Sequence, residues 1–198
     1  MNIGILGGSF DPPHRGHTAI ANRLLKMNCF DQIWLMPCHQ HPFTKNLSKP
    51  NKRLEMVKFL ENKKIIVSDL EINKKTISYS IDTLKALLKK TPKNKFSWII
   101  GTDQVEDFCK WKAWKEIVNN FKLVIVPRIN FKKAEEKIKD IRKQVATPEN
   151  IIFFSKKTFP PVYASSTLVR QRNKEKKSIS SLVPKKIEKY IIQNGLYL

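Results

Sequence analysis

The first 27 residues constrain the fold most, because they join a short apolar run to a helix through a turn rich in glycine and histidine. Residues 2–6 are Asn-Ile-Gly-Ile-Leu, a run typical of a buried strand. After the turn, Ile20, Leu24 and Met27 recur at helical spacing and predict one apolar face of a helix. This order predicts an α/β unit, in which ligands bind at the carboxyl edge of the parallel strand.

The rest of the chain continues the alternation of apolar runs and helical patterns. Strands are predicted over residues 2–6, 32–36, 64–68, 96–100, 122–126 and 151–154, and helices over 17–27, 53–60, 80–89, 104–118, 134–145, 167–173 and 184–194. Such alternation predicts an α/β fold with a doubly wound parallel sheet. A length of 198 residues suits a single domain over 1–198, with a C-terminal helical segment of about 165–198 packed on it.

The turn between the first strand and helix offers the chemistry of a phosphate site. Gly7 and Gly8 have no Cβ, so backbone amides there can approach a phosphate closely. The helix N-terminus adds a partial positive charge, and His14 and His17 are spaced to point the same way. Two capping or packing histidines are the alternative. Zinc is a further option, but no third ligand lies nearby at metal spacing.

A second anion site is predicted near the end of the chain. Ser165, Ser166 and Thr167 open a predicted helix, where hydroxyl groups cap the helix and exposed amides can hold an anion. Arg170 lies one turn further and can fork onto phosphate oxygens. The alternative is an ordinary N-cap with a surface arginine.

Three features in the middle of the chain have both a structural and a binding interpretation. Ser80 opens a helix and could be a plain N-cap, or its neighbouring amides could hold an anion. Asp103 follows the fourth strand and could bond a ribose hydroxyl or cap a helix. Of Trp111 and Trp114, one is expected in the core, and the other could stack on a flat ligand ring.

The segment after the second strand, residues 37–45, has two prolines and no periodicity, which predicts a loop. Lys45 at its end could reach a phosphate as a point charge. Cys38, His39 and His41 could suggest a metal, but they are too close together to form a tetrahedral site alone.

Composition limits the class of protein. The net charge of +21 invites a nucleic-acid interpretation, but the lysines are spread along the whole chain, which favours a compositional bias over a recognition surface. No apolar run is long enough to span a membrane, and because a strand is predicted from residue 2, we expect no signal peptide. Cys29, Cys38 and Cys109 are scattered, so we expect reduced thiols in a cytoplasmic protein.

The histidine turn resembles the G-x-F-D-P-x-H-x-G-H signature of the nucleotidyltransferase superfamily. It matches at Gly8, Phe10, Asp11, Pro12, His14, Gly16 and His17. Residues 78–84 resemble the S-Y-T-x-x-T-L element of the bacterial nicotinate-nucleotide adenylyltransferases, and residues 101–103 with Trp111 resemble its G-x-D and following tryptophan. Residues 164–170 resemble its I-S-S-T-x-I-R, with Ala164 in place of isoleucine, and residues 182–197 resemble its closing segment.

The resemblance implies a Rossmann-like nucleotidyltransferase fold and the transfer of an adenylyl group from ATP to nicotinate mononucleotide. His14 and His17 would be the catalytic residues. The residues implied to bind ATP are Gly8, Ser9, Phe10, His14, His17, Asp103, Ser165, Ser166, Thr167 and Arg170, and those implied to bind the mononucleotide are Ser80, Tyr79, Trp111 and Lys45.

Magnesium would come with ATP, with no metal held by the protein alone and no tightly bound cofactor. The loop departs from the family's P-P-H-[KR], since residues 41–45 are His-Pro-Phe-Thr-Lys, and Lys45 is the residue of this loop that could make the phosphate contact. The alternative activity is a related adenylyltransferase that uses nicotinamide mononucleotide, and the alternative class is an RNA- or DNA-binding module. We expect ATP and nicotinate mononucleotide as the partners, with no specific nucleic-acid partner and no membrane partner.

Overall fold

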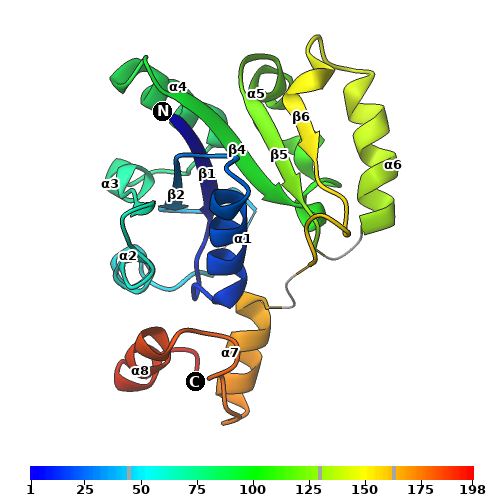
Figure 1. Ribbon diagram of the computed structural model, residues 1–198. Coiled ribbons are helices and arrows are strands. Elements are labelled where there is room, and N and C mark those ends of the chain that lie inside the picture. The colour runs from blue at the N-terminus through cyan, green and yellow to red at the C-terminus, as the bar shows by residue number, and fades with distance from the viewer. Residues whose placement is uncertain (44–45, 129–130, 162–163) are drawn as a thin grey trace.

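A parallel β-sheet with helices on both faces forms the centre of the molecule (Figure 1). The computed structural model describes residues 1–43, 46–128, 131–161 and 164–198. The strands lie in the order β3-β2-β1-β4-β5-β6 and every neighbouring pair is parallel. Their bounds are β1 Asn2–Gly8, β2 Gln32–Pro37, β3 Ile65–Val67, β4 Lys95–Gly101, β5 Lys122–Val126 and β6 Ile151–Phe153. The predicted doubly wound parallel sheet is therefore confirmed.

The helices follow the strands much as the apolar periodicity predicts. They are α1 Arg15–Lys26, α2 Pro50–Lys58, α3 Leu70–Lys74, α4 Ser80–Lys90, α5 Trp114–Asn120, α6 Phe131–Arg142, α7 Ser166–Lys174 and α8 Lys185–Gln193. The short α3 was not predicted. After α8, Gly195 adopts a positive φ of 56°, as expected for the glycine that ends a helix. No helix of the described part of the chain is long and apolar enough to cross a membrane.

Side chains of β1 alternate between the two faces of the sheet. Ile3 and Ile5 pack in a cluster with apolar residues of α4, α5 and α6. Leu6 packs in a second cluster with residues of α1, α2, α7 and α8. The chain builds β1 to β3 outward on one side and then crosses to β4 on the other side of β1, so β1 and β4 lie at the point where the strand order reverses. Loops after two such strands run in opposite directions, and ligands commonly bind between them.

The predicted helix over residues 104–118 is wrong. The segment instead forms two 3₁₀ turns, at Thr102–Gln104 and Phe108–Lys110, before α5 begins at Trp114. Ala113 has a φ of 50° and Trp111 is extended, so the helical path is interrupted between them. Both Trp111 and Trp114 contact the buried ring of Phe108, and this aromatic packing favours the break.

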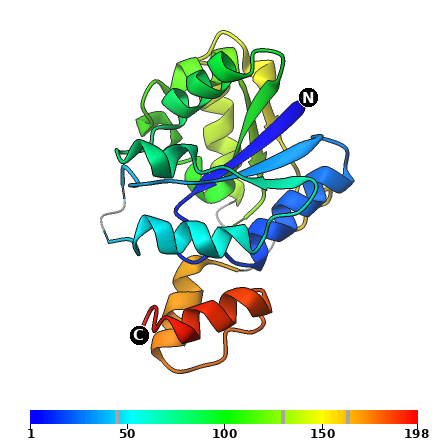
Figure 2. The same ribbon diagram turned by 90° about the vertical axis from the view of Figure 1, so that its left-hand side faces the viewer.

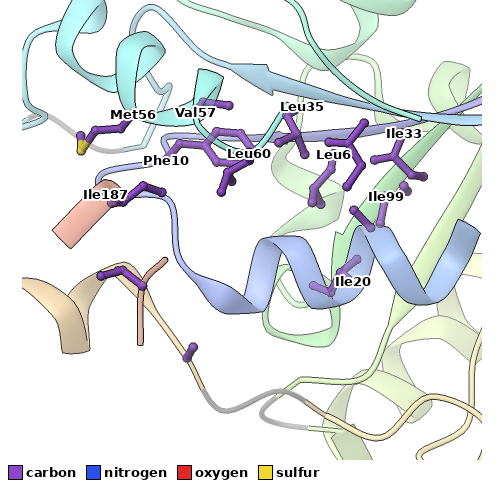
Figure 3. Close-up of a cluster of buried hydrophobic side chains, with 14 of the residues drawn as sticks. Leu6, Phe10, Ile20, Ile33, Leu35, Met56, Val57, Leu60, Ile99 and Ile187 are labelled. Carbon is purple, nitrogen blue, oxygen red and sulfur yellow. The ribbon is translucent and has the colours of Figure 1, made fainter. Parts of the chain in front are cut away.

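Helices α7 and α8 lie together at one end of the molecule, next to the start of α1 (Figures 1 and 2). The Arg15 backbone N–H donates to the Leu182 carbonyl at 2.8 Å. Ile187 of α8 belongs to the same apolar cluster as Phe10, Met56 and Leu60 (Figure 3). The ring of Phe10 is buried in this cluster, and its backbone has a φ of 50°. The turn after β1 is thus packed between α2 and the α7–α8 segment.

A buried arginine joins the loops at the carboxyl edge. Arg53 of α2 is fully buried, and its guanidinium donates to four backbone carbonyls. Two are at the edge itself, Ser9 and Cys38, each 2.7 Å from Nη1. The others are His39, 2.7 Å from Nη2, and Ser48, 2.9 Å from Nε. One side chain therefore sets the spacing between the turn after β1 and the loop after β2.

We expect Arg53→Lys to lower the free energy of unfolding by about 3 kcal/mol or more, because one ammonium cannot replace four diverging hydrogen bonds and each bond to a charged group contributes about 1.5–3 kcal/mol. Urea unfolding of the variant beside wild type measures this. Lys58→Ala, an exposed change in the same helix, is the control and should stay within about 0.5 kcal/mol of wild type. Equal midpoints for Arg53→Lys and wild type would contradict the assignment.

Candidate active site

The two histidines of the turn cap the start of α1. His14 is the N-cap residue, and its Nδ1 accepts a hydrogen bond from the Gly16 backbone N–H at 3.1 Å. Nδ1 of His17 accepts from the His14 backbone N–H, also at 3.1 Å. The ring centroids lie 3.8 Å apart. The capping interpretation is therefore confirmed, and because it uses only Nδ1, it leaves the opposite nitrogen of each ring for other chemistry.

Both rings are neutral near pH 7. Burial, with the charge of Arg128 as a smaller cause, lowers the pKa of His14 to about 3. Burial, His14 and Arg128 together lower the pKa of His17 well below its usual value. A neutral imidazole that accepts through Nδ1 carries its proton on Nε2. The turn thus presents two Nε2–H donors, held by backbone hydrogen bonds.

The start of α7 is tied directly to this turn. Ser165 is the N-cap, as predicted, and its hydroxyl accepts from the Leu168 N–H at 3.1 Å. The Ser166 hydroxyl donates to the Pro12 carbonyl at 2.8 Å. Arg170 donates through Nη1 to the Asp11 carbonyl at 2.6 Å and through Nη2 to the Thr167 hydroxyl at 3.4 Å. Two motifs about 150 residues apart in the chain are thereby brought together.

A cavity of about 470 Å³ opens beside the end of β1. It is lined by Gly7, Gly8, Cys38, His41, Pro42, Phe43, Glu71, Ser78, Tyr79, Ser80, Trp98, Gln104, Lys110, Trp111, Lys112 and Ile117. Only glycine fits at position 7, because a Cβ there would lie 2.4 Å from the indole of Trp98. The structure therefore brings Tyr79, Ser80 and Trp111 to one pocket, whereas Trp114 is not among its described lining residues.

Several predicted details of this pocket and its surroundings are corrected. Tyr79, and not Ser80, is the N-cap residue of α4, so Ser80 is the first residue of the helix. Asp103 does not cap a helix: its Oδ2 accepts from Nη1 of Arg128 at 3.1 Å, and the buried Oδ1 has no hydrogen-bond partner among the described residues. The side chain of Phe10 is buried in the core, which leaves its backbone as the part that could contact a ligand.

Contacts with the protein hold the described part of the loop after β2. Cys38 is buried, and burial raises the pKa of its thiol to about 11. Nδ1 of His39 lies 3.2 Å from the Ile72 carbonyl, and Nδ1 of His41 accepts from the Phe43 N–H. Among the described residues, no group of three or more His, Cys, Asp and Glu side chains could hold a metal ion. Lys45 lies outside the described residues.

Comparison with known proteins identifies the family. The family model described as cytidylyltransferase-like matches residues 5–172. Nicotinate-nucleotide adenylyltransferase of Bacillus subtilis (strain 168) is 34% identical over 199 residues, covering 98% of this chain and 97% of the relative. A probable nicotinate-nucleotide adenylyltransferase of Buchnera aphidicola subsp. Schizaphis graminum is 37% identical over 206 residues, covering 98% and 94%. The chain belongs to the nicotinate-nucleotide adenylyltransferase family.

Solved structures agree on the fold. Plasmodium falciparum nicotinic acid mononucleotide adenylyltransferase complexed with NaAD superposes with a TM-score of 0.79 at 22% identity, covering 99% of this chain and 97% of that one. A putative nicotinate-nucleotide adenylyltransferase from Vibrio parahaemolyticus gives a TM-score of 0.68 at 20% identity, covering 99% and 94%. The Rossmann-like nucleotidyltransferase fold implied by the signature is thus confirmed.

Three charged side chains that line the pocket were not among the predicted site residues. Lys110 and Lys112 flank Trp111 at the cavity, and their alternation with the tryptophan was the signal available. Glu71 is buried, and its Oε1 accepts from the Thr83 hydroxyl at 2.6 Å. Burial raises the pKa of this carboxyl. Nothing in the sequence distinguishes Glu71 from a surface glutamate, because its partner lies on another helix.

The neutral state of His14 makes stability depend on pH. Its pKa is about 3 in the folded chain and has an ordinary value of 6.5, so below pH 6.5 the unfolded chain binds a proton that the folded chain does not. The free energy of unfolding therefore falls as the pH drops from 6.5 toward 3, by at most about 1.4 kcal/mol per pH unit for this one group.

His14→Asn keeps an acceptor at the N-cap but does not titrate, so urea unfolding between pH 7 and pH 4 should show a shallower loss in the variant than in wild type. Parallel curves for the two proteins would show that His14 is not held neutral by the fold.

Proposed function

We propose that this chain transfers the adenylyl group of ATP to nicotinate mononucleotide and releases pyrophosphate. A phosphate oxygen of the mononucleotide attacks the α-phosphorus of ATP, the bond from that phosphorus to the bridging oxygen breaks, and deamido-NAD forms. The observation that carries the proposal is the arrangement of three features. The neutral rings of His14 and His17 offer two Nε2–H donors, the start of α7 is hydrogen-bonded to the same turn, and a cavity lined by Trp111 lies beside them. The names of the relatives, and the NaAD in the Plasmodium complex, support the same reaction.

The proposed chemistry requires positioning and charge stabilisation rather than proton transfer. The attacking phosphate is already anionic, so no general base is needed. His14 and His17 would donate from Nε2 to the α-phosphate, where negative charge grows in the transition state. Gly8, Ser9 and the backbone of Phe10 would approach the same region, since they belong to the same turn and Gly8 and Ser9 are half-buried.

The leaving pyrophosphate is assigned to the start of α7. The backbone N–H groups of Ser166 and Thr167 belong to the first turn of α7, beside the N-cap Ser165, and a helix start of this kind suits an anion. Arg170 adds a guanidinium that is already oriented by the Asp11 carbonyl. Asp103 is proposed to accept from a ribose hydroxyl of ATP, because its Oδ1 is the buried acceptor with no partner in the described part of the chain.

The mononucleotide is assigned to the 470 Å³ cavity. Trp111 would stack on the pyridine ring, and the start of α4 near Tyr79 and Ser80 would face its carboxylate. Lys110 and Lys112 add positive charge at this pocket, and the Lys112 ammonium lies 4.9 Å from the Tyr79 ring centroid. Lys45 is proposed as a further phosphate contact, and this assignment rests only on the resemblance of its loop to that of the family.

Magnesium is proposed to arrive with ATP as part of the substrate. Mg²⁺ usually keeps several waters and binds through substrate phosphates rather than an all-protein cage. The donor set fits this mode, since His14, His17 and Arg170 offer hydrogen-bond donors to phosphate oxygens, and no group of three or more His, Cys, Asp and Glu side chains that the structure describes could hold the ion by itself. We also propose a cytoplasmic location, which agrees with three free thiols.

His17 separates capping from catalysis experimentally. His17→Asn keeps an acceptor near the position of Nδ1 and removes Nε2–H, so we expect a loss of about 100- to 1,000-fold in kcat with an unchanged fold. His17→Gln places an N–H donor near the position of Nε2 and should retain more turnover. Pyrophosphate release and circular dichroism measure the two properties. Near-normal turnover in a folded His17→Asn variant would remove the turn from the mechanism.

Acid and amide substrates test the pocket. An amide must place two N–H donors where the α4 start and two lysines also offer donors, and each mismatch costs about 1.5–3 kcal/mol. We therefore expect kcat/KM for nicotinate mononucleotide to exceed that for nicotinamide mononucleotide by about a hundredfold or more. Equal values, or a preference for the amide, would favour the alternative substrate.

The two tryptophans provide a matched pair for the same assay. Trp111→Ala should lower kcat/KM for both mononucleotides and reduce the ratio between the two values, because the ring that fixes the angle of the pyridine is lost. Trp114→Ala removes a similar contact with Phe108 and should leave the ratio unchanged. Equal effects of the two changes would show that Trp111 acts only by packing.

A further inference from the structure

A buried carboxylate lies where three distant segments meet. Asp11 is 3% exposed and precedes His14 by three residues. Its Oδ1 accepts from the Tyr197 hydroxyl at 2.6 Å, and its Oδ2 accepts from the Ser48 backbone N–H at 3.0 Å. Its carbonyl accepts from Arg170 at 2.6 Å. Both carboxylate oxygens and the main chain of Asp11 are therefore engaged, so this residue has little freedom to move alone.

Tyr197 is held in place by α7 itself. The segment after α8 turns back through two residues with positive φ, Gly195 at 56° and Tyr197 at 63°. Nδ2 of Asn173 donates to the Leu196 carbonyl at 2.8 Å and to the Tyr197 carbonyl at 3.3 Å. Asn173 belongs to the helix that also carries Ser166 and Arg170. The hydroxyl of Tyr197 thus links α7 to the histidine turn by a third route, independent of Ser166 and Arg170.

We propose that Tyr197 is a positioning residue, which fixes Asp11 and thereby the separation between the histidine turn and the phosphate-binding start of α7. The inference rests on the proposed function, since the two groups it spaces are those assigned to the α-phosphate and the leaving pyrophosphate. Misplacement by about 1 Å in such a site can cost about 100-fold in rate. The phenol remains a donor at all physiological pH values, because burial and the adjacent Asp11 raise its pKa.

A purely structural role predicts a different pattern. If Tyr197 only docked the α7–α8 segment, any comparable hydroxyl joining that segment to the rest of the chain would matter equally. Tyr190 of α8 supplies the comparison, because its hydroxyl donates to Glu55 of α2 without contact to the turn. Tyr197→Phe and Tyr190→Phe each remove one phenolic oxygen from the same segment, so they form a matched pair.

Steady-state kinetics with ATP and nicotinate mononucleotide distinguish the two roles. For Tyr197→Phe we expect kcat to fall about tenfold and KM for ATP to rise, with KM for the mononucleotide within twofold of wild type. Tyr190→Phe should stay within twofold in every constant. Asn173→Ala, which releases the backbone of residues 196 and 197, should reproduce the Tyr197→Phe pattern and serves if that variant fails to fold.

A second readout does not depend on turnover. The imidazole ¹H–¹⁵N signals of His14 and His17 should shift in Tyr197→Phe and remain in place in Tyr190→Phe. Wild-type kinetics with unmoved imidazole signals in Tyr197→Phe, or equal effects of the two tyrosine changes, would overturn the inference. A wild-type protein that turns over neither mononucleotide would overturn the proposed function alone, and the imidazole signals would still decide whether Tyr197 positions the turn.

Discussion

The hydrogen bond from the Gly16 N–H to Nδ1 of His14 supports both the structure of the turn and its chemistry. It starts α1 at the carboxyl edge of β1, and it leaves the proton of a neutral ring on Nε2. The His14 N–H repeats the arrangement by donating to Nδ1 of His17. Glycine is required at position 16, because a Cβ there would lie 2.8 Å from the His14 ring. Capping and ligand binding are therefore two uses of the same side chains.

Buried polar groups hold the surrounding loops to this turn. Arg53 donates hydrogen bonds to carbonyls of the turn and of the loop after β2. Asp11 accepts hydrogen bonds from the segment before α2 and from the segment after α8. Buried backbone carbonyls and carboxylates are costly when unpaired, so each of these groups has little choice of partner. The carboxyl edge is thus cross-linked by hydrogen bonds at the turn after β1, and open at the cavity beside Trp111.

Features that depend on neighbouring residues in the sequence were predicted correctly, whereas features that depend on contacts between different elements were missed. Strands such as β5 were predicted because a strand buried on both faces reads as an uninterrupted apolar run. The helix over 104–118 failed because Phe108 draws Trp111 and Trp114 onto one buried ring, and Ala113 takes a positive φ to allow it. Arg53 and Glu71 were missed because Arg53 donates to carbonyls of loops as far away as Ser9, and the partner of Glu71 is the hydroxyl of Thr83 on another helix.

Periodicity and short motifs are local properties, so the amino-acid sequence was enough to predict all six described strands, most of the helices, the family signature and the residue types at each end of the site. The packing of the chain was needed to place Ser166 and Arg170 against the histidine turn, Trp111 among the described lining residues of the pocket, and Tyr197 against Asp11. The physical reason is that burial selects one partner for each polar group, and burial is a property of the packed chain.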